Sequence, residues 1–208
     1  MLTILPPAFA LIEAHRLADS QAGLRWLAAL PPHCGVLIRR AERHTNTRQL
    51  RRFVRAARAG RRCVLIGGAW QLAWQAGAGA HFSEAALRRM GRVRPRQLAS
   101  AAVHSRAALM RAQRLRVALV LVSPVFATPS HRGARPLGVL RFAAWAQQLQ
   151  RRRLPRRGAP ASHAPALYAL GGMDARAWRR LSAARMAART AGYVAQRAFA
   201  ISRTPLCA

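Results

Sequence analysis

The strongest constraint in this sequence of 208 residues is a repeated alternation of short apolar runs with longer amphipathic segments. Such alternation is typical of β–α repeats that build a parallel sheet. Eight apolar runs are predicted to be strands: Phe9–Ile12, Gly35–Ile38, Cys63–Ile66, Ala80–Phe82, Leu98–Ala102, Val117–Val122, Ala166–Leu170 and Gly192–Ala195. Helices are predicted between them over Ser20–Leu30, Thr47–Ala59, Ser105–Gln113, Gly138–Arg153 and Asp174–Ala184.

Eight repeats of this kind predict a single (β/α)8 barrel over residues 1–208, with an open doubly wound sheet as the alternative. The hydrophobic content of 52% is enough for one sizeable core. Two stretches interrupt the alternation. Pro124–Pro136 is predicted to be a long loop after the sixth strand, and Leu154–Pro165 is predicted to be a flexible, basic connection before the seventh.

The charge balance is extreme, because all 36 basic residues are arginine and the net charge is +31. The five acidic residues are Glu13, Asp19, Glu42, Glu84 and Asp174. A chain of this composition attracts polyanions with an affinity that depends on salt. GC-rich codons favour arginine and alanine, and the arginines are spread over several predicted helices. We therefore expect a solvated basic surface with non-specific polyanion binding rather than a dedicated nucleic-acid site.

Membrane and secretory signals are absent from the pattern. No apolar run approaches the roughly 18 to 20 residues of a membrane span. The first residues lack the basic region and the cleavage site of a signal peptide. Cys34, Cys63 and Cys207 have no metal-type spacing, so reduced thiols are expected. These features predict a cytoplasmic protein that does not bind membranes.

The sixth and seventh strands are each followed by residues suited to binding an anion. Ser123–Gly138 reads Ser-Pro-Val-Phe-Ala-Thr-Pro-Ser-His-Arg-Gly-Ala-Arg-Pro-Leu-Gly, and the seventh strand ends in Gly171-Gly172. Paired glycines let backbone N–H groups approach a phosphate with no Cβ in the way. Because the working residues of such barrels lie at the carboxyl ends of strands, the two loops predict a shared phosphate site.

The segment after the sixth strand resembles the thiamine phosphate synthases and their thiazole tautomerase relatives. These proteins carry Gly/Ser-Pro-(Ile/Val)-(Phe/Tyr)-x-Thr-x-Thr/Ser-Lys, followed by Pro-Leu-Gly. Thr128 and Ser130 match this segment, and His131 stands where the family has a lysine that contacts pyrophosphate. The resemblance implies that Thr128, Ser130 and the paired glycines bind substrate phosphates.

The resemblance also implies a contribution from the eighth strand, which in the family ends in a hydrophobic residue and a serine. Gln196 and Arg197 stand at that place here. Their backbone N–H groups are expected to help bind phosphate, and the guanidinium of Arg197 adds a charge-assisted donor.

The other half of the family pattern is largely missing. Of the Gln-Leu-Arg-x-Lys run at the second strand, this chain keeps Arg39. The family binds Mg²⁺ through an aspartate in Asn-Asp-Arg after the third strand, where this chain has Gly67-Gly68-Ala69, and through a second aspartate after the fourth, where Glu84 is the nearby carboxylate. Mg²⁺ is therefore expected from the family, but its usual ligands are absent.

The resemblance implies a transferase of thiamine biosynthesis that joins hydroxymethylpyrimidine pyrophosphate to thiazole phosphate. Departure of pyrophosphate needs positive charge, which Arg39 and His131 are predicted to supply as catalytic residues. Two alternatives stay open. One is a catalytically degenerate barrel that binds a phosphorylated ligand. The other is a thiazole tautomerase-like isomerase, which needs no magnesium site but needs a positioned base, His104 or His131.

Overall fold

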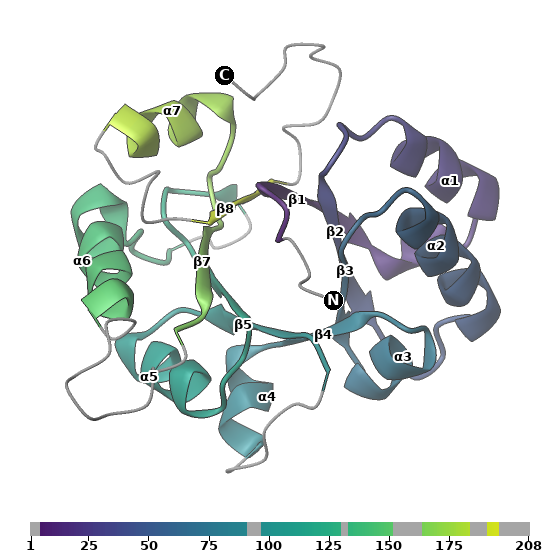
Figure 1. The fold of residues 1–208 in the computed structure, drawn as a ribbon, viewed down its shortest axis with the longest axis horizontal. Coiled ribbons are helices and arrows are strands. Elements are labelled where there is room, and N and C mark those ends of the chain that lie inside the picture. Colours follow the sequence, from purple (N-terminus) through teal and green to yellow (C-terminus); the bar gives the residue numbers. More distant parts are fainter. Residues whose placement is uncertain (1–4, 91–96, 130–132, 152–163, 184–190, 196–208) are drawn as a thin grey trace.

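Eight parallel strands form a closed barrel in chain order (Figure 1). The computed structural model describes residues 5–90, 97–129, 133–151, 164–183 and 191–195. The strands are β1 (Ala8–Glu13), β2 (Gly35–Ala41), β3 (Val64–Gly68), β4 (Gly79–Phe82), β5 (Ala99–Val103), β6 (Leu119–Val122), β7 (Ala166–Ala169) and β8 (Gly192–Ala195). β1 pairs with both β2 and β8, which closes the barrel. The predicted (β/α)8 barrel is confirmed.

Helices surround the barrel on its outside (Figure 1). They are η1 (Ala14–Leu17), α1 (Ser20–Ala28), α2 (Thr47–Ala59), α3 (Trp70–Gln75), α4 (Glu84–Arg89), α5 (Arg106–Arg114), α6 (Gly138–Arg151) and α7 (Ala175–Ala183). The predictions located the five longer helices but not η1, α3 and α4, which are too short to show a helical period. Among the described residues, no helix has the length and apolar character to cross a membrane.

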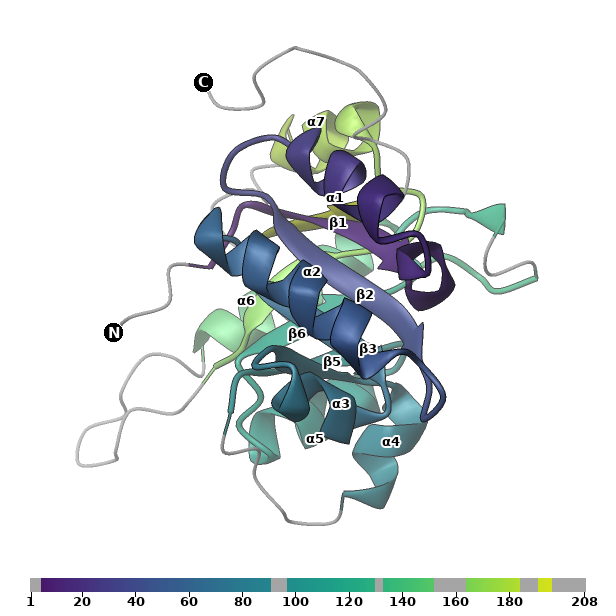
Figure 2. The same ribbon diagram turned by 90° about the vertical axis from the view of Figure 1, so that its right-hand side faces the viewer.

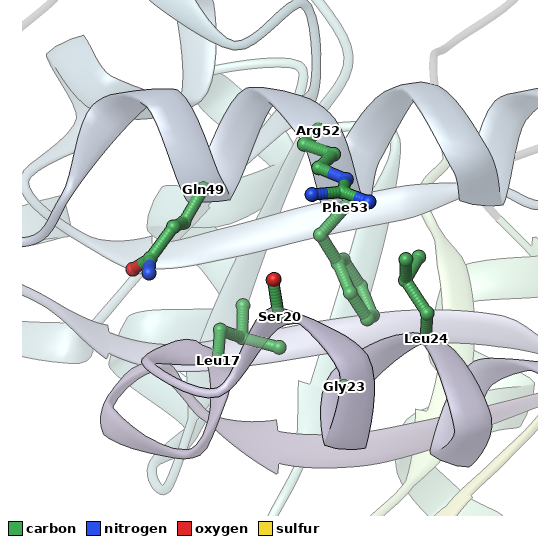
Figure 3. Close-up of a pocket in the computed structure, with 7 residues that line it drawn as sticks. All are labelled: Leu17, Ser20, Gly23, Leu24, Gln49, Arg52 and Phe53. Carbon is green, nitrogen blue, oxygen red and sulfur yellow. The ribbon is translucent and has the colours of Figure 1, made fainter.

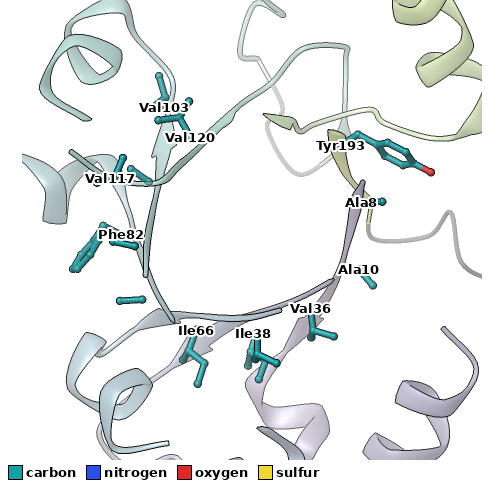
Figure 4. Close-up of a cluster of buried hydrophobic side chains, with 14 of the residues drawn as sticks. Ala8, Ala10, Val36, Ile38, Ile66, Phe82, Val103, Val117, Val120 and Tyr193 are labelled. Atoms are coloured by element: carbon teal, nitrogen blue, oxygen red, sulfur yellow. The ribbon is translucent and has the colours of Figure 1, made fainter. Parts of the chain in front are cut away.

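Side chains of each strand alternate between two apolar clusters. One cluster fills the barrel and includes Phe9, Leu11, Leu37, Leu121 and Tyr168. The other packs between the strands and the helices, and Figure 4 shows members such as Ile38, Ile66 and Phe82 pointing away from the barrel centre. Because successive side chains of a strand face opposite sides, the inward series continues past the apolar residues. At the carboxyl ends of the strands it becomes polar.

The amino ends of the strands are closed by aromatic packing. The Tyr168 hydroxyl donates a hydrogen bond of 2.7 Å to the Pro6 carbonyl. Its ring meets Phe9 edge-on, with the ring centres 5.2 Å apart. The opening of the barrel that carries polar side chains is therefore the one at the carboxyl ends, and the side view of Figure 2 shows β1 and β2 running toward it.

Three helices end at the amino-end face with the same hydrogen-bond pattern. The bonds are Arg62 N–H to Ala57 O (2.9 Å) after α2, Ala78 N–H to Ala73 O (2.8 Å) after α3, and Val117 N–H to Ala112 O (3.2 Å) after α5. Each ending needs one residue in the left-handed region. That residue is Gly77 after α3 (φ 72°) but Arg61 (φ 55°) and Arg116 (φ 54°) after the other two. An arginine there costs about 1 kcal/mol relative to glycine.

Candidate active site

A buried carboxylate lies at the carboxyl-end mouth of the barrel. Glu13 ends β1 two residues beyond Leu11, so it continues the inward-facing series. Its Oε1 lies 3.8 Å from Arg39 Nη1, and its Oε2 lies 3.9 Å from Arg40 Nε. Oε2 is buried and has no hydrogen-bond partner among the described residues. Glu13 therefore places a negative charge beside Arg39, and the sequence motifs had not pointed to it.

A neutral histidine lies on the same inner surface. Nδ1 of His81, on β4, is 2.8 Å from the hydroxyl oxygen of Ser100, which β5 buries completely. Burial first, and then the neighbouring Arg39 and His104, lower the pKa of His81 from 6.5 to about 4. His81 is consequently uncharged at neutral pH.

His104 is held in one orientation by the backbone of the next strand. Its Nδ1 lies 2.7 Å from the carbonyl oxygen of Ser123, which follows β6. A carbonyl oxygen can only accept, so Nδ1 carries the proton and the basic lone pair of the neutral ring is on Nε2. This geometry prepares Nε2 to act as a general base.

Glu84 supports His104 from the start of α4. Its Oε2 accepts a hydrogen bond of 2.9 Å from the His104 backbone N–H, and its Oε1 accepts one of 2.9 Å from the Ser105 hydroxyl. The Ser105 oxygen in turn accepts from the Ala108 N–H at 3.1 Å and caps α5. Both oxygens of Glu84 are thus used to fix the turn between β5 and α5.

The first magnesium position of the family is occupied by backbone. Gly68 stands where the family has its aspartate, and its φ is 125°. A Cβ at Gly68 would overlap the Ala41 carbonyl oxygen, which accepts a hydrogen bond of 2.7 Å from the Ala69 N–H. No three histidine, cysteine, aspartate or glutamate residues of the described chain are grouped to hold a metal ion. These residues do not fit the magnesium site that the family implies.

The loop after β6 packs directly against the end of β7. The Val125 N–H donates to the Leu170 carbonyl at 2.9 Å, and the Phe126 N–H donates to the Gly171 carbonyl at 3.1 Å. A Cβ at Gly172 would lie 2.7 Å from the Phe126 Cβ, so this close packing requires glycine. The N–H groups of Gly171 and Gly172 donate no hydrogen bond to any described residue. They are available to an anion.

The predicted phosphate-binding residues fall into two groups. Thr128 is half-buried two residues beyond Phe126, in the loop that contacts Gly171 and Gly172. Ser130, His131, Gln196 and Arg197 lie outside the described residues, as does most of the basic connection at 154–165, so their assignments stay predictions. Arg39 ends up across the mouth from Thr128, because β2 and β6 are opposite strands in the ring.

Ser123 joins the oriented histidine to the paired glycines. Its carbonyl accepts the His104 Nδ1 proton, and its side chain is buried, with 3% exposure. Its Oγ lies 3.1 Å from the point that a Cβ on Gly171 would occupy. This Oγ has no hydrogen-bond partner among the residues that the structure describes. Ser123 therefore contacts both the His104 ring and the turn that carries the Gly171 N–H group. In the sequence, Ser123 is the first residue of the family-like segment, and no role was predicted for it.

A hollow on the outside of the barrel is unrelated to this mouth. It is a shallow depression between α1 and α2 (Figure 3). The Gln49 amide beside it donates to the Ala18 carbonyl at 2.8 Å. The lining residues are Leu17, Ser20, Gly23, Leu24, Gln49, Arg52 and Phe53. We regard it as a seam between packed helices.

Comparison with known proteins agrees with this architecture. Thiamine phosphate pyrophosphorylase from Pyrococcus furiosus superposes with a TM-score of 0.64 at 14% identity, over 95% of this chain and 88% of its own. An HpcH/HpaI aldolase from Desulfitobacterium hafniense (TM-score 0.58, 10% identity, 92% and 86% covered) and the citrate synthase SbnG (0.58, 9%, 92% and 86%) share the fold. No curated protein sequence gives a significant match.

These structural likenesses establish the fold alone, since all three identities are low. The sequence model described as thiamine monophosphate synthase, in contrast, matches residues 22–192, which is most of the chain. This match includes the loop after β6, the paired glycines and His104. The chain belongs to the thiamine monophosphate synthase family.

Proposed function

We propose that this protein is an acid–base isomerase that moves a proton on a phosphorylated thiazole, as the thiazole tautomerases that it resembles do. Family membership supports a function related to thiamine. The observation that carries the finer proposal is the meeting of His104 and Gly171 at Ser123. It brings a base in a defined tautomer next to N–H groups that suit a phosphate.

The proposed reaction uses residues of the loops at the carboxyl-end mouth. The N–H groups of Gly171 and Gly172 and the hydroxyl of Thr128 bind the phosphate. Nε2 of His104 takes a proton from one ring carbon, and the resulting imidazolium returns a proton to another carbon of the same ligand. The proton count is unchanged, and no leaving group departs. A positioned acid–base group of this kind contributes roughly 10²–10⁴-fold in rate.

The missing magnesium ligands are compatible with this chemistry. A synthase expels pyrophosphate, whose charge must be compensated as it leaves. A tautomerisation develops far less charge, so it does not require the two carboxylate positions that Gly68 and Glu84 now use for packing and bracing.

The synthase reaction is the second candidate, and one observation favours it. Arg39 lies near the carboxyl end of β2, across the ring of strands from β6, and the synthase proposal assigns its guanidinium, with His131, to compensate charge on a pyrophosphate. In that case Arg39 must exchange its ion pair with Glu13 for the substrate.

One experiment separates these functions. The purified protein is incubated in D₂O with thiazole phosphate supplied as its non-aromatic ring tautomer, and NMR follows both the aromatic product and deuterium incorporation. The isomerase proposal expects turnover that falls about 100-fold in His104→Gln, in line with removal of a general base. His15→Gln, on an exposed position, is the matched control.

A parallel incubation supplies hydroxymethylpyrimidine pyrophosphate and thiazole phosphate, with and without Mg²⁺. Formation of thiamine phosphate without tautomer turnover would replace the isomerase by the synthase. Binding of thiazole phosphate with neither reaction would identify a degenerate, ligand-binding barrel.

A further inference from the structure

All five carboxylates of the chain lie at one end of the barrel. Glu13 ends β1 and Glu42 follows β2 directly. The other three stand where helices begin: Asp19 caps α1, Glu84 is the first residue of α4, and Asp174 accepts from the Ala177 N–H at 2.7 Å. Helices of a (β/α)8 barrel begin at the face where strands end. The opposite, amino-end face therefore carries no aspartate or glutamate side chain.

Arginines occupy that amino-end face. Arg61, Arg89, Arg114 and Arg116 lie at or just beyond helix ends there and are exposed. Other arginines nearby are structural: Arg62, for example, donates to the carbonyls of Leu30, Pro31 and Cys34 at 2.6–3.0 Å. The side chains of Arg61 and Arg116 have no such partner in the described chain.

The backbone conformation at two of these arginines indicates that base composition is not the reason for their presence. Arg61 and Arg116 occupy the left-handed position that Gly77 occupies after α3, in the same hydrogen-bond pattern. Glycine is the residue with the least strain there. Glycine codons are as GC-rich as arginine codons, so base composition does not explain arginine at these positions. Favourable interaction with the helix dipole is strongest within the last turn, which ends before either residue.

The types of exposed side chain on the amino-end face indicate which class of polyanion it can bind. Large exposed apolar side chains among the described residues are Trp70 and Leu140, and both lie in the first turn of a helix, at the carboxyl-end face. Proteins that anchor in a membrane surface combine cations with apolar side chains, and sites for single-stranded nucleic acid combine them with aromatic rings that stack on the bases. Exposed guanidinium groups without either suit the phosphates of a duplex.

We propose that the amino-end face binds the phosphate backbone of double-stranded nucleic acid without reading its bases, and that Arg61 and Arg116 are two of its contacts. This surface is separate from the mouth, which opens at the other end of the barrel. A duplex bound there leaves the mouth accessible to small substrates.

The test compares two double variants that lose the same charge. Fluorescence anisotropy measures binding of a labelled random duplex about two helical turns long, over a series of KCl concentrations. For Arg61→Gly/Arg116→Gly we expect affinity to fall about tenfold at low salt and the slope of log affinity against log salt to shrink by about 2. The same variant should melt a few degrees higher, because glycine relieves two strained positions.

The control is Arg43→Gln/Arg106→Gln, which removes two exposed arginines from the carboxyl-end face. We expect its duplex affinity to stay within about twofold of the parent. Equal losses in both double variants, or no loss in Arg61→Gly/Arg116→Gly, would overturn the proposal. Tighter binding to phosphatidylserine vesicles than to the duplex would also overturn it, in favour of a membrane. These binding measurements do not depend on isomerase activity, so the proposed function and the duplex-binding proposal are tested separately.

Discussion

His81 shows how a barrel can keep a titratable side chain uncharged. Burial removes water from its ring, and Arg39 and His104 add positive charge nearby. Each of these disfavours an imidazolium, and the resulting pKa is about 4. The neutral ring is a polar group that the mouth can hold beside a guanidinium without repulsion.

The first prediction follows from this pKa. In the unfolded chain His81 titrates near 6.5, so between pH 6.5 and 4 the unfolded state binds more protons than the folded one. The contribution of His81 to the free energy of unfolding is therefore complete above pH 6.5. On acidification it falls by up to about 1.4 kcal/mol per pH unit. Urea denaturation between pH 7.5 and 4.5 measures this slope. His81→Gln should flatten it, and His15→Gln should leave it unchanged; equal slopes in all three proteins would contradict the assignment.

Glu84 supplies the second prediction. Glu84→Ala removes two hydrogen bonds to a carboxylate and leaves the His104 N–H without its acceptor, so we expect a loss of about 1.5–3 kcal/mol in unfolding free energy. Glu42→Ala is the control, because the exposed Glu42 carboxylate only lies 3.7 Å from His44 Nε2 and should contribute less than about 0.5 kcal/mol. Chemical denaturation compares the two. A loss at Glu84 no larger than at Glu42 would show that the brace is weak.

Among the elements, the turns after β6 and β7 depend on each other. Two backbone hydrogen bonds join them, and Gly172 lets Phe126 pack against the chain. A side chain at that position would separate the loop from the strand end. The N–H groups that we assign to phosphate binding therefore depend on the loop that carries Thr128.

The third prediction concerns two glycines of like conformation. Gly172 (φ 63°) and Gly133 (φ 79°) are both left-handed, but a Cβ at Gly133 would meet nothing within 4 Å. Gly133→Ala should thus lose about 1 kcal/mol from backbone strain alone. Gly172→Ala should lose about 2–4 kcal/mol, since it adds a clash with Phe126. Thermal unfolding of both variants tests the difference. Equal losses in unfolding free energy would mean that Phe126 moves aside at no energetic cost.

The elements also show what sequence could predict. Eight strands followed from apolar runs with turns between them, because burial on both faces of a barrel strand leaves a clear pattern. The three shortest helices span at most six residues, which is too short to give a helical pattern in the sequence. The loop after β6 was predicted from its interruption of the alternation, and its family motif gave residues such as Thr128 a role. The contacts of Glu13 with Arg39, and of His104 with Ser123, were not predicted, because they join neighbouring strands through inward side chains and a backbone carbonyl.

At the scale of the whole molecule, the carboxylates are dispersed around the mouth. The five carboxylates lie in four β–α connections, with Glu13 and Asp19 both in the first, and four of them already pair with arginine, cap a helix or brace a turn. A hard cation such as Mg²⁺ needs several oxygen ligands at one point.

The fourth prediction is accordingly weak Mg²⁺ binding by the protein alone. Isothermal titration should give a dissociation constant in the millimolar range or weaker, as expected for one or two carboxylates and water. Glu84→Gln, which removes the carboxylate nearest the family's second position, should leave the titration unchanged. A micromolar constant would show that carboxylates come together in a way the described geometry does not provide.

The confinement of all five acidic side chains to one end also contributes a permanent electric dipole along the barrel axis. Near an extended negative surface, such as mica or a cation-exchange resin, the field turns the carboxylate-free end toward the surface. Molecules adsorbed in this way share one orientation, with the barrel opening directed into the solution. A film of the protein on such a support would therefore keep its substrate entrance exposed without any engineered tether.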